Sequence, residues 1–132
     1  MRPIKQQHSY GCGIACVAYI TKVRYQDVIN SIDDGANKAE NKGFFCKELT
    51  GFLKNNGLHY RWKYINIKTR NKIYHQGTIV FIKRSKRYPS GHYLARNGNT
   101  WMDPWINFPD AIIKAGFRKR LPGKVIYAIL PK

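Results

Sequence analysis

Three side chains in this sequence could together carry out nucleophilic chemistry on a carbonyl group. Cys12 lies at the start of an expected helix, where the helix dipole and unpaired N–H groups favour a thiolate. His92 opens one strand of an expected hairpin and Asp103 closes the other, so strand pairing can bring the two side chains together. A nucleophilic thiol needs a base, and the base needs an orienting acid. The spacing therefore predicts a Cys-His-Asp catalytic triad.

The residues around Cys12 fit the same chemistry. Gln6 lies six residues upstream, and its amide could donate a hydrogen bond to a developing oxyanion alongside the backbone N–H of Cys12. Gln7 competes for this role, but its spacing from the cysteine fits less well. Gly11 and Gly13 flank Cys12 and leave room for a substrate backbone to approach. Gly11 and Gly13 are therefore candidate substrate-binding residues.

The distribution of acidic residues supports the choice of Asp103. The interval between Glu48 and Asp103 contains no Asp or Glu, although eleven Lys and Arg residues lie within it. An acid on an apolar strand in such a basic stretch indicates a specific role. Asp110 is a later competitor, but its place after a proline favours the first turn of a helix.

The cysteines favour free thiols. Cys12, Cys16 and Cys46 are an odd number, which argues against a disulfide framework. Cys16 is expected to be a small buried apolar residue. A zinc site formed by the three cysteines and a histidine is a weaker interpretation, because a second closely spaced ligand pair is missing. We expect no metal and no other cofactor.

Length and composition indicate one folded domain spanning residues 1–132. Hydrophobic residues make up 43% and aromatic residues 14% of the chain, enough for a packed core. Lys and Arg number 24 against 7 Asp and Glu, a net charge of +17. A surface this basic attracts polyanions or acidic peptides. The sequence contains no recognisable DNA- or RNA-binding motif. It also has no membrane-spanning apolar run and no secretory signal, so we expect a cytoplasmic protein unless another system exports it.

The hydrophobic spacing predicts helices first and strands afterwards. Helical spacing covers residues 11–21, resumes at Asp27 with Val28, Ile29 and Ile32, and ends at Gly35 and the polar stretch to Lys42. A third helix is expected over residues 44–54, with a stop at Asn55-Asn56-Gly57.

Alternating spacing after Gly57 predicts an antiparallel sheet. Residues 91–96 and 100–103 form a hairpin around Asn97-Gly98-Asn99, because Asn-Gly supplies the positive φ that tight turns require. The other expected strands cover residues 60–65, 78–82 and 125–130, and a short helix is expected over residues 109–115. The fold class is therefore α+β, with N-terminal helices packed on a C-terminal antiparallel sheet.

These motifs occur together, in this order, in a known family. Gln6-Gln7-His8-Ser9-Tyr10-Gly11-Cys12-Gly13-Ile14-Ala15-Cys16 resembles the N-terminal signature of the peptidase C39 family. These papain-like cysteine peptidases include the bacteriocin-processing domains of peptide-exporting ABC transporters. The later family motifs match His92-Tyr93-Leu94 and Asp103-Pro104.

The resemblance implies a papain-like fold and the triad Cys12, His92 and Asp103, with Gln6 in the oxyanion hole. It also implies cleavage after a small-residue pair such as Gly-Gly at the end of a leader peptide. A transporter or an immunity protein is then a possible partner, and neither a metal nor a nucleotide is required. Gly91 and Trp105, beside the histidine and the aspartate, are further candidates for substrate binding.

The sequence is also compatible with functions other than peptide cleavage. The charge of +17 fits a papain-like toxin or effector that acts on or binds nucleic acid. The thiol could instead serve deamidation or acyl transfer, or the domain could bind leader peptides without cleaving them. The run Lys83-Arg84-Ser85-Lys86-Arg87, shortly before His92, is either a solvated loop or an electrostatic guide for an acidic peptide or a phosphate backbone.

Overall fold

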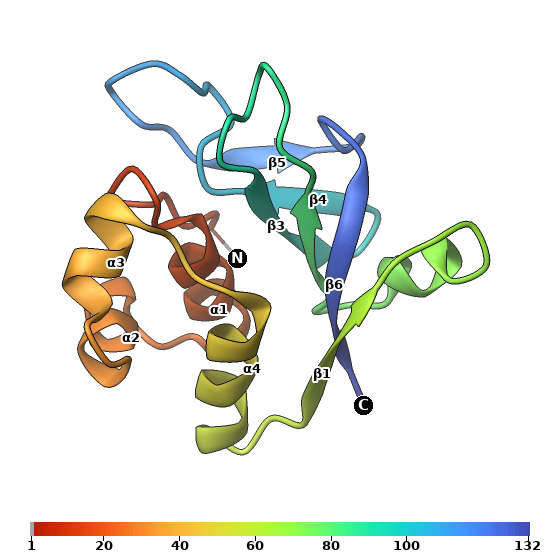
Figure 1. Cartoon of the computed structure of the whole chain (residues 1–132), viewed down its shortest axis with the longest axis horizontal. Coiled ribbons are helices and arrows are strands. Elements are labelled where there is room, and N and C mark those ends of the chain that lie inside the picture. Colours follow the sequence, from red (N-terminus) through yellow and green to blue (C-terminus); the bar gives the residue numbers. More distant parts are fainter. Residues whose placement is uncertain (1) are drawn as a thin grey trace.

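Helices form the first part of the chain and strands the second. The computed structural model describes residues 2–132 (Figure 1). Within these residues the helices are α1 (Cys12–Thr21), α2 (Tyr25–Ser31), α3 (Gly35–Asn41) and α4 (Cys46–Asn55), followed later by the 3-10 helix η1 (Arg70–Tyr74). The strands are β1 (Tyr60–Tyr64), β2 (Ile79–Ile82), β3 (His92–Asn97), β4 (Thr100–Asp103), β5 (Gly116–Arg118) and β6 (Val125–Pro131). The predicted α+β arrangement is confirmed.

The six strands form one antiparallel sheet in the order β1-β6-β2-β3-β4-β5. The predicted hairpin is present as β3 and β4, with Asn97 opposite Thr100 and Gly98 at φ 59° in the turn. The four α-helices lie together beside the sheet (Figure 1), with α1 packed on β3 and α4 on β1.

Apolar side chains fill both sides of the sheet. Between helices and sheet, the core includes the whole stretch from Ile14 to Tyr19 of α1, and a helix buried this completely must be apolar all round. A second cluster around Trp101 and Leu94 lies on the other side of the sheet. The two clusters leave β3 and β4 buried, so polar side chains on these strands need partners within the protein.

Four segments differ from the sequence-based expectation, and two of them, η1 and β5, were not expected at all. Residues 35–41 form α3, where a polar stretch was expected to end the second helix. The short helix expected over residues 109–115 is absent, and this segment is a loop that leads into β5. The Asn107 side chain binds the carbonyl of Ile112 and the N–H of Lys114, and the Trp105 indole binds the carbonyl of Asp110. These bonds take up backbone groups that a helix would have used.

No helix within residues 2–132 combines the length and the apolar character needed to cross a bilayer.

Candidate active site

His92 and Asp103 form a buried pair at the end of the β3–β4 hairpin. The Nε2 atom of His92 lies 2.7 Å from Oδ1 of Asp103. His92 is 3% exposed and Asp103 is fully buried, so this contact is shielded from water. The pairing of β3 with β4 positions both side chains, as the sequence predicts. Because Nε2 faces Asp103, the second ring nitrogen, Nδ1, is left for another partner.

The carboxylate of Asp103 has two further donors. Oδ1 also accepts the backbone N–H of Trp105 at 3.0 Å, and Oδ2 accepts Nη1 of Arg118 at 3.0 Å. Arg118 comes from β5, where it pairs with Trp101 of β4. Both carboxylate oxygens are therefore bonded. Arg118 is not predicted from the sequence, because no strand is expected at β5 and only the β4–β5 pairing brings this arginine to the acid.

An aromatic stack holds the plane of the His92 ring. The ring of Tyr88 lies parallel to it, with 4.9 Å between ring centroids and 8° between planes. Tyr88 is buried and packs in turn against Phe108, at 5.0 Å between centroids. With its edge bonded to Asp103 and its face on Tyr88, the imidazole has little freedom to rotate.

Cys12 is the first residue of α1 and lies beside His92. Burial of the imidazole opposes its protonation, but the hydrogen bond to Asp103, the nearby Cys12 sulfur and the negative charges of both groups favour it. The balance raises the pKa of His92 to about 9. Burial also opposes ionisation of Asp103, and the bonds from His92, the Trp105 N–H and Arg118 outweigh it, so the pKa of Asp103 is lowered. The structure thus favours a charged imidazolium–carboxylate pair.

The other two cysteines lie in a different environment. Cys16 is buried within α1, and its burial, with the nearby Cys12 and Asp103, raises its pKa well above the usual value. Burial likewise raises the pKa of Cys46, whose sulfur lies 3.6 Å from Oη of Tyr93. All three thiols are free, and Cys12 is the most exposed of them. Reaction with a dissolved reagent at neutral pH is therefore favoured at Cys12.

Gln6 is buried at the start of the loop that leads to Cys12. Its Nε2 atom donates to the carbonyls of His8 at 2.9 Å and Ser9 at 3.2 Å. Its backbone N–H binds the carbonyl of Pro104, which links this loop to the residue after Asp103. Gln6 thus braces the loop, and a bond from its amide to an oxyanion would have to replace one of the two carbonyl contacts. Its part in an oxyanion hole stays a prediction.

The flanking glycines have a packing reason. A Cβ atom on Gly11 would lie 1.9 Å from Oη of Tyr25, and one on Gly13 would lie 2.8 Å from Cδ1 of Leu49. Their missing side chains therefore make room for the protein's own side chains, and contact with a substrate stays a prediction. Gly91 has φ 76° and faces Phe81 closely, so it shapes the turn before His92.

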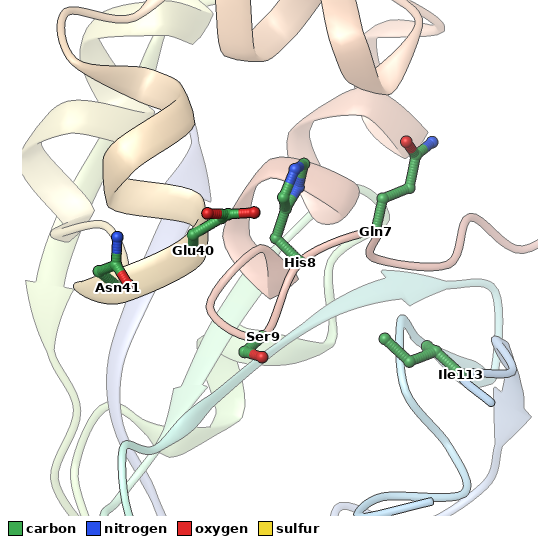
Figure 2. Close-up of a pocket in the computed structure, with 6 residues that line it drawn as sticks. All are labelled: Gln7, His8, Ser9, Glu40, Asn41 and Ile113. Carbon is green, nitrogen blue, oxygen red and sulfur yellow. The ribbon is translucent and has the colours of Figure 1, made fainter. Parts of the chain in front are cut away.

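A pocket of about 260 Å³ adjoins the segment that leads into α1. Figure 2 shows that its lining comes from this segment, from the end of α3 and from the β4–β5 loop. Among the lining residues, His8 stacks on Tyr25, with Nδ1 3.1 Å from the tyrosine hydroxyl. The residues lining this pocket are Gln7, His8, Ser9, Glu40, Asn41 and Ile113. Over residues 2–132 there is no grouping of three or more His, Cys, Asp or Glu side chains that could hold a metal ion.

Comparison with known proteins supports the fold. The structure is similar to the peptidase domain of Streptococcus ComA, described as a bi-functional ABC transporter involved in a quorum-sensing pathway. The match has a TM-score of 0.60 and 16% sequence identity, and covers 99% of this chain and 98% of the other. No family model matches the sequence, and no curated protein matches it. The fold implied by the resemblance to the peptidase C39 family is confirmed.

The charged His92–Asp103 pair predicts a particular dependence of stability on pH. Because the pKa of His92 is raised to about 9, its contribution is fully present below about pH 6.5 and is lost as pH rises towards 9. Because the pKa of Asp103 is lowered, its contribution is present above its usual value of 3.8 and is lost as pH falls through the lowered value. Urea denaturation of the wild type and His92→Gln should therefore show the largest difference near pH 5–6 and a shrinking difference towards pH 9. Parallel stability curves between pH 6 and 9 would contradict the charged pair.

Arg118 should stabilise the protein through Asp103. Replacing Arg118 with Met leaves Oδ2 of a fully buried carboxylate without a donor, which should lower the free energy of unfolding by about 1–3 kcal/mol. Arg120→Met, at an exposed position two residues later, is the matched control and should change it by less than about 0.5 kcal/mol. In a double-mutant cycle with Asp103→Asn, the two substitutions should be strongly non-additive. Additive effects would show that Arg118 acts elsewhere.

Proposed function

We propose that residues 1–132 form a cysteine peptidase domain, with Cys12 as nucleophile, His92 as general base and acid, and Asp103 as the orienting acid. The observation that carries this proposal is the buried 2.7 Å contact between His92 and Asp103, with the histidine beside a thiol at the N-terminus of α1. The likeness in fold to a known peptidase domain supports it.

Because the raised pKa of His92 favours the imidazolium, the reaction would begin from an ion pair in which His92 already holds the proton of the Cys12 thiol. The thiolate then attacks the carbonyl carbon of a peptide bond, and the carbonyl oxygen becomes an oxyanion bound by the backbone N–H of Cys12 and by Gln6. Collapse of this intermediate breaks the C–N bond, and His92 gives its proton to the departing amine. Water, deprotonated by the same histidine, attacks the thioester, releases the carboxylate product and restores the thiol.

The surroundings of His92 suit these proton transfers. Its raised pKa favours the imidazolium that forms when the thiol is deprotonated. Asp103 can stay ionised throughout, because Arg118 and the Trp105 N–H bind it whatever the charge of His92. Tyr88 stacks on the ring, so the imidazole would keep one orientation while it takes up and releases the proton.

The substrate proposed is a peptide cleaved after a small-residue pair such as Gly-Gly, at the end of a leader. This specificity follows from the resemblance of the Gln6–Cys16, His92 and Asp103 motifs to the peptidase C39 family. The structural neighbour belongs to an ABC transporter, which supports a peptide substrate and an association with a transporter. Free thiols at all three cysteines suit a reducing compartment, so we place the domain in the cytoplasm.

Peptide cleavage tests the proposal directly. The wild type should cut a synthetic peptide after its Gly-Gly pair, as detected by mass spectrometry, and Cys12→Ala should not. Iodoacetamide at pH 7 should modify Cys12 in preference to Cys16 and Cys46, whose pKa values are raised by burial. His92→Ala should slow both cleavage and labelling, because the thiol loses its base.

Cys46→Ala is the matched control, since it removes a thiol away from the triad and should leave cleavage unchanged. Cleavage by the Cys12→Ala variant would overturn the proposed mechanism. Labelling of Cys12 with no cleavage of any Gly-Gly peptide would leave a reactive thiol but refute the assigned specificity.

Gln6 offers a separate test of the oxyanion hole. If its amide stabilises the oxyanion, Gln6→Ala should lower kcat on the order of 10²–10³-fold with little change in KM. Gln7→Ala, at the exposed neighbouring position, should leave kcat nearly unchanged. If Gln6→Ala instead lowers the free energy of unfolding while kcat of the folded protein is retained, the residue serves only to brace the loop through His8 and Ser9.

A further inference from the structure

Positive charge is concentrated in the sheet half of the molecule. Residues 56–132, which follow α4 and contain the whole sheet, hold 16 of the 24 Lys and Arg residues but only two of the seven acids. One of these acids, Asp103, is buried and bonded to His92 and Arg118, so it does not neutralise the surface. The other, Asp110, lies on the exposed β4–β5 loop. The positive charge on the surface of this half is therefore almost uncompensated by acidic side chains.

Two loops bring part of this charge together. The β2–β3 loop and the β5–β6 loop lie at the same end of the sheet (Figure 1), and the backbone N–H of Lys83 binds the carbonyl of Lys124 at 2.8 Å. Among the residues that the structure describes, none of the basic side chains on these loops lies within salt-bridge distance of an acid. We call this surface the basic rim; its members, all exposed, are Lys83, Arg84, Lys86, Arg87, Lys119, Arg120 and Lys124.

Both loops of the basic rim are joined to the candidate triad. Arg87 lies over the ring of Tyr88, 5.3 Å from its centroid, and Tyr88 stacks on His92. Hydrogen bonds between Ser85 and Tyr88 fix the loop that carries the first four members. On the other side, Lys119 follows directly after Arg118, which binds Asp103. The basic rim is therefore held beside His92 and Asp103 by defined contacts.

The charge and the side chains of the basic rim favour an acidic polypeptide over a nucleic acid. Seven like charges without acidic neighbours repel one another, and an anionic ligand relieves this repulsion. Binding of single-stranded nucleic acid also uses exposed aromatic rings for base stacking. Of the rings near the basic rim, Tyr88 is buried and Phe117 of β5, although 36% exposed, packs edge-on against Tyr19, while the exposed Trp62 and Tyr64 lie on β1, at the opposite edge of the sheet from β5.

We propose that the basic rim binds an acidic segment of the peptide substrate and draws the scissile bond to the catalytic residues. This inference rests on the proposed peptidase function and names its substrate class. It predicts that acidic residues near the cleavage point increase kcat/KM and that added salt removes the advantage, because salt screens charges at a solvent-exposed surface.

The test measures binding and cleavage separately. Three fluorescent peptides share one Gly-Gly site; the first carries four Glu before it, the second four Glu after it, and the third Gln at all these positions. Anisotropy with the Cys12→Ala protein in 20 mM salt should show that at least one Glu peptide binds about 10-fold or more tightly than the Gln peptide. The preference should fall to about twofold in 0.5 M salt. The wild type should show the same preference in kcat/KM.

Matched triple variants locate the effect. The first variant neutralises part of the basic rim and spares Arg87, which contacts Tyr88. It combines Lys83→Gln, Arg84→Gln and Lys86→Gln. The control neutralises three exposed residues on β1 and η1 or the segment between them, namely Arg61→Gln, Lys68→Gln and Lys72→Gln. Both variants remove the same charge, so only the variant of the basic rim should lose the preference for Glu peptides.

Several outcomes would overturn the inference. Equal binding of Glu and Gln peptides, or equal losses in the two triple variants, would show that the basic rim does not select acidic peptides. A single-stranded DNA of the same charge that binds more tightly than the Glu peptides, and loses affinity in the variant of the basic rim, would assign the surface to nucleic acid. Cleavage of all three peptides at one rate would refute this inference and leave the peptidase intact. Selective binding of the Glu peptides without any cleavage would refute the proposed peptidase activity and leave the proposed binding surface in place.

Discussion

The structure depends on a carboxylate that has no contact with water. A buried charge is costly unless it is paired and hydrogen-bonded, and Asp103 receives donors from His92, Arg118 and the Trp105 N–H. These donors come from β3, from β5 and from the chain just after β4, so satisfying one acid requires three neighbouring strands in register. The constraint that keeps the acid charged is also the constraint that places the histidine.

The strand β3 links this acid to the helix that carries the thiol. Consecutive strand residues point to opposite faces, so His92 can reach Asp103 while Tyr93 turns to the helical side. Tyr93 packs beside Gly13 of α1, and its hydroxyl donates to the carbonyl of Phe44. A larger residue at position 13 would push α1 away from β3 and move Cys12 with it. The distance between thiol and imidazole is thus set by packing on one face and by hydrogen bonding on the other.

Local patterns in the sequence predict the contact between His92 and Asp103 in the candidate site. The Gly98-Asn99 turn closes the hairpin, and the hairpin holds His92 against Asp103, so both residues could be chosen from the order of the amino acids alone. Arg118 could not be chosen, because the pairing of β4 with a three-residue strand leaves no recognisable period in the sequence. The helix expected at residues 109–115 failed for a related reason: side chains of Asn107 and Trp105 satisfy that backbone instead. The pairing of two strands decided the first case, and side-chain bonds within one loop decided the second.

The position of Arg118 places part of the acid's support at the margin of the sheet. The strand β5 has three residues and pairs with β4 alone, so it has few bonds to break before it detaches. Short edge strands open locally at a far smaller free-energy cost than global unfolding. Asp103 would then keep His92 and the Trp105 N–H but lose its guanidinium until the strand closes again. The lifetime of the complete donor set is therefore governed by fraying of one edge strand rather than by the stability of the whole protein.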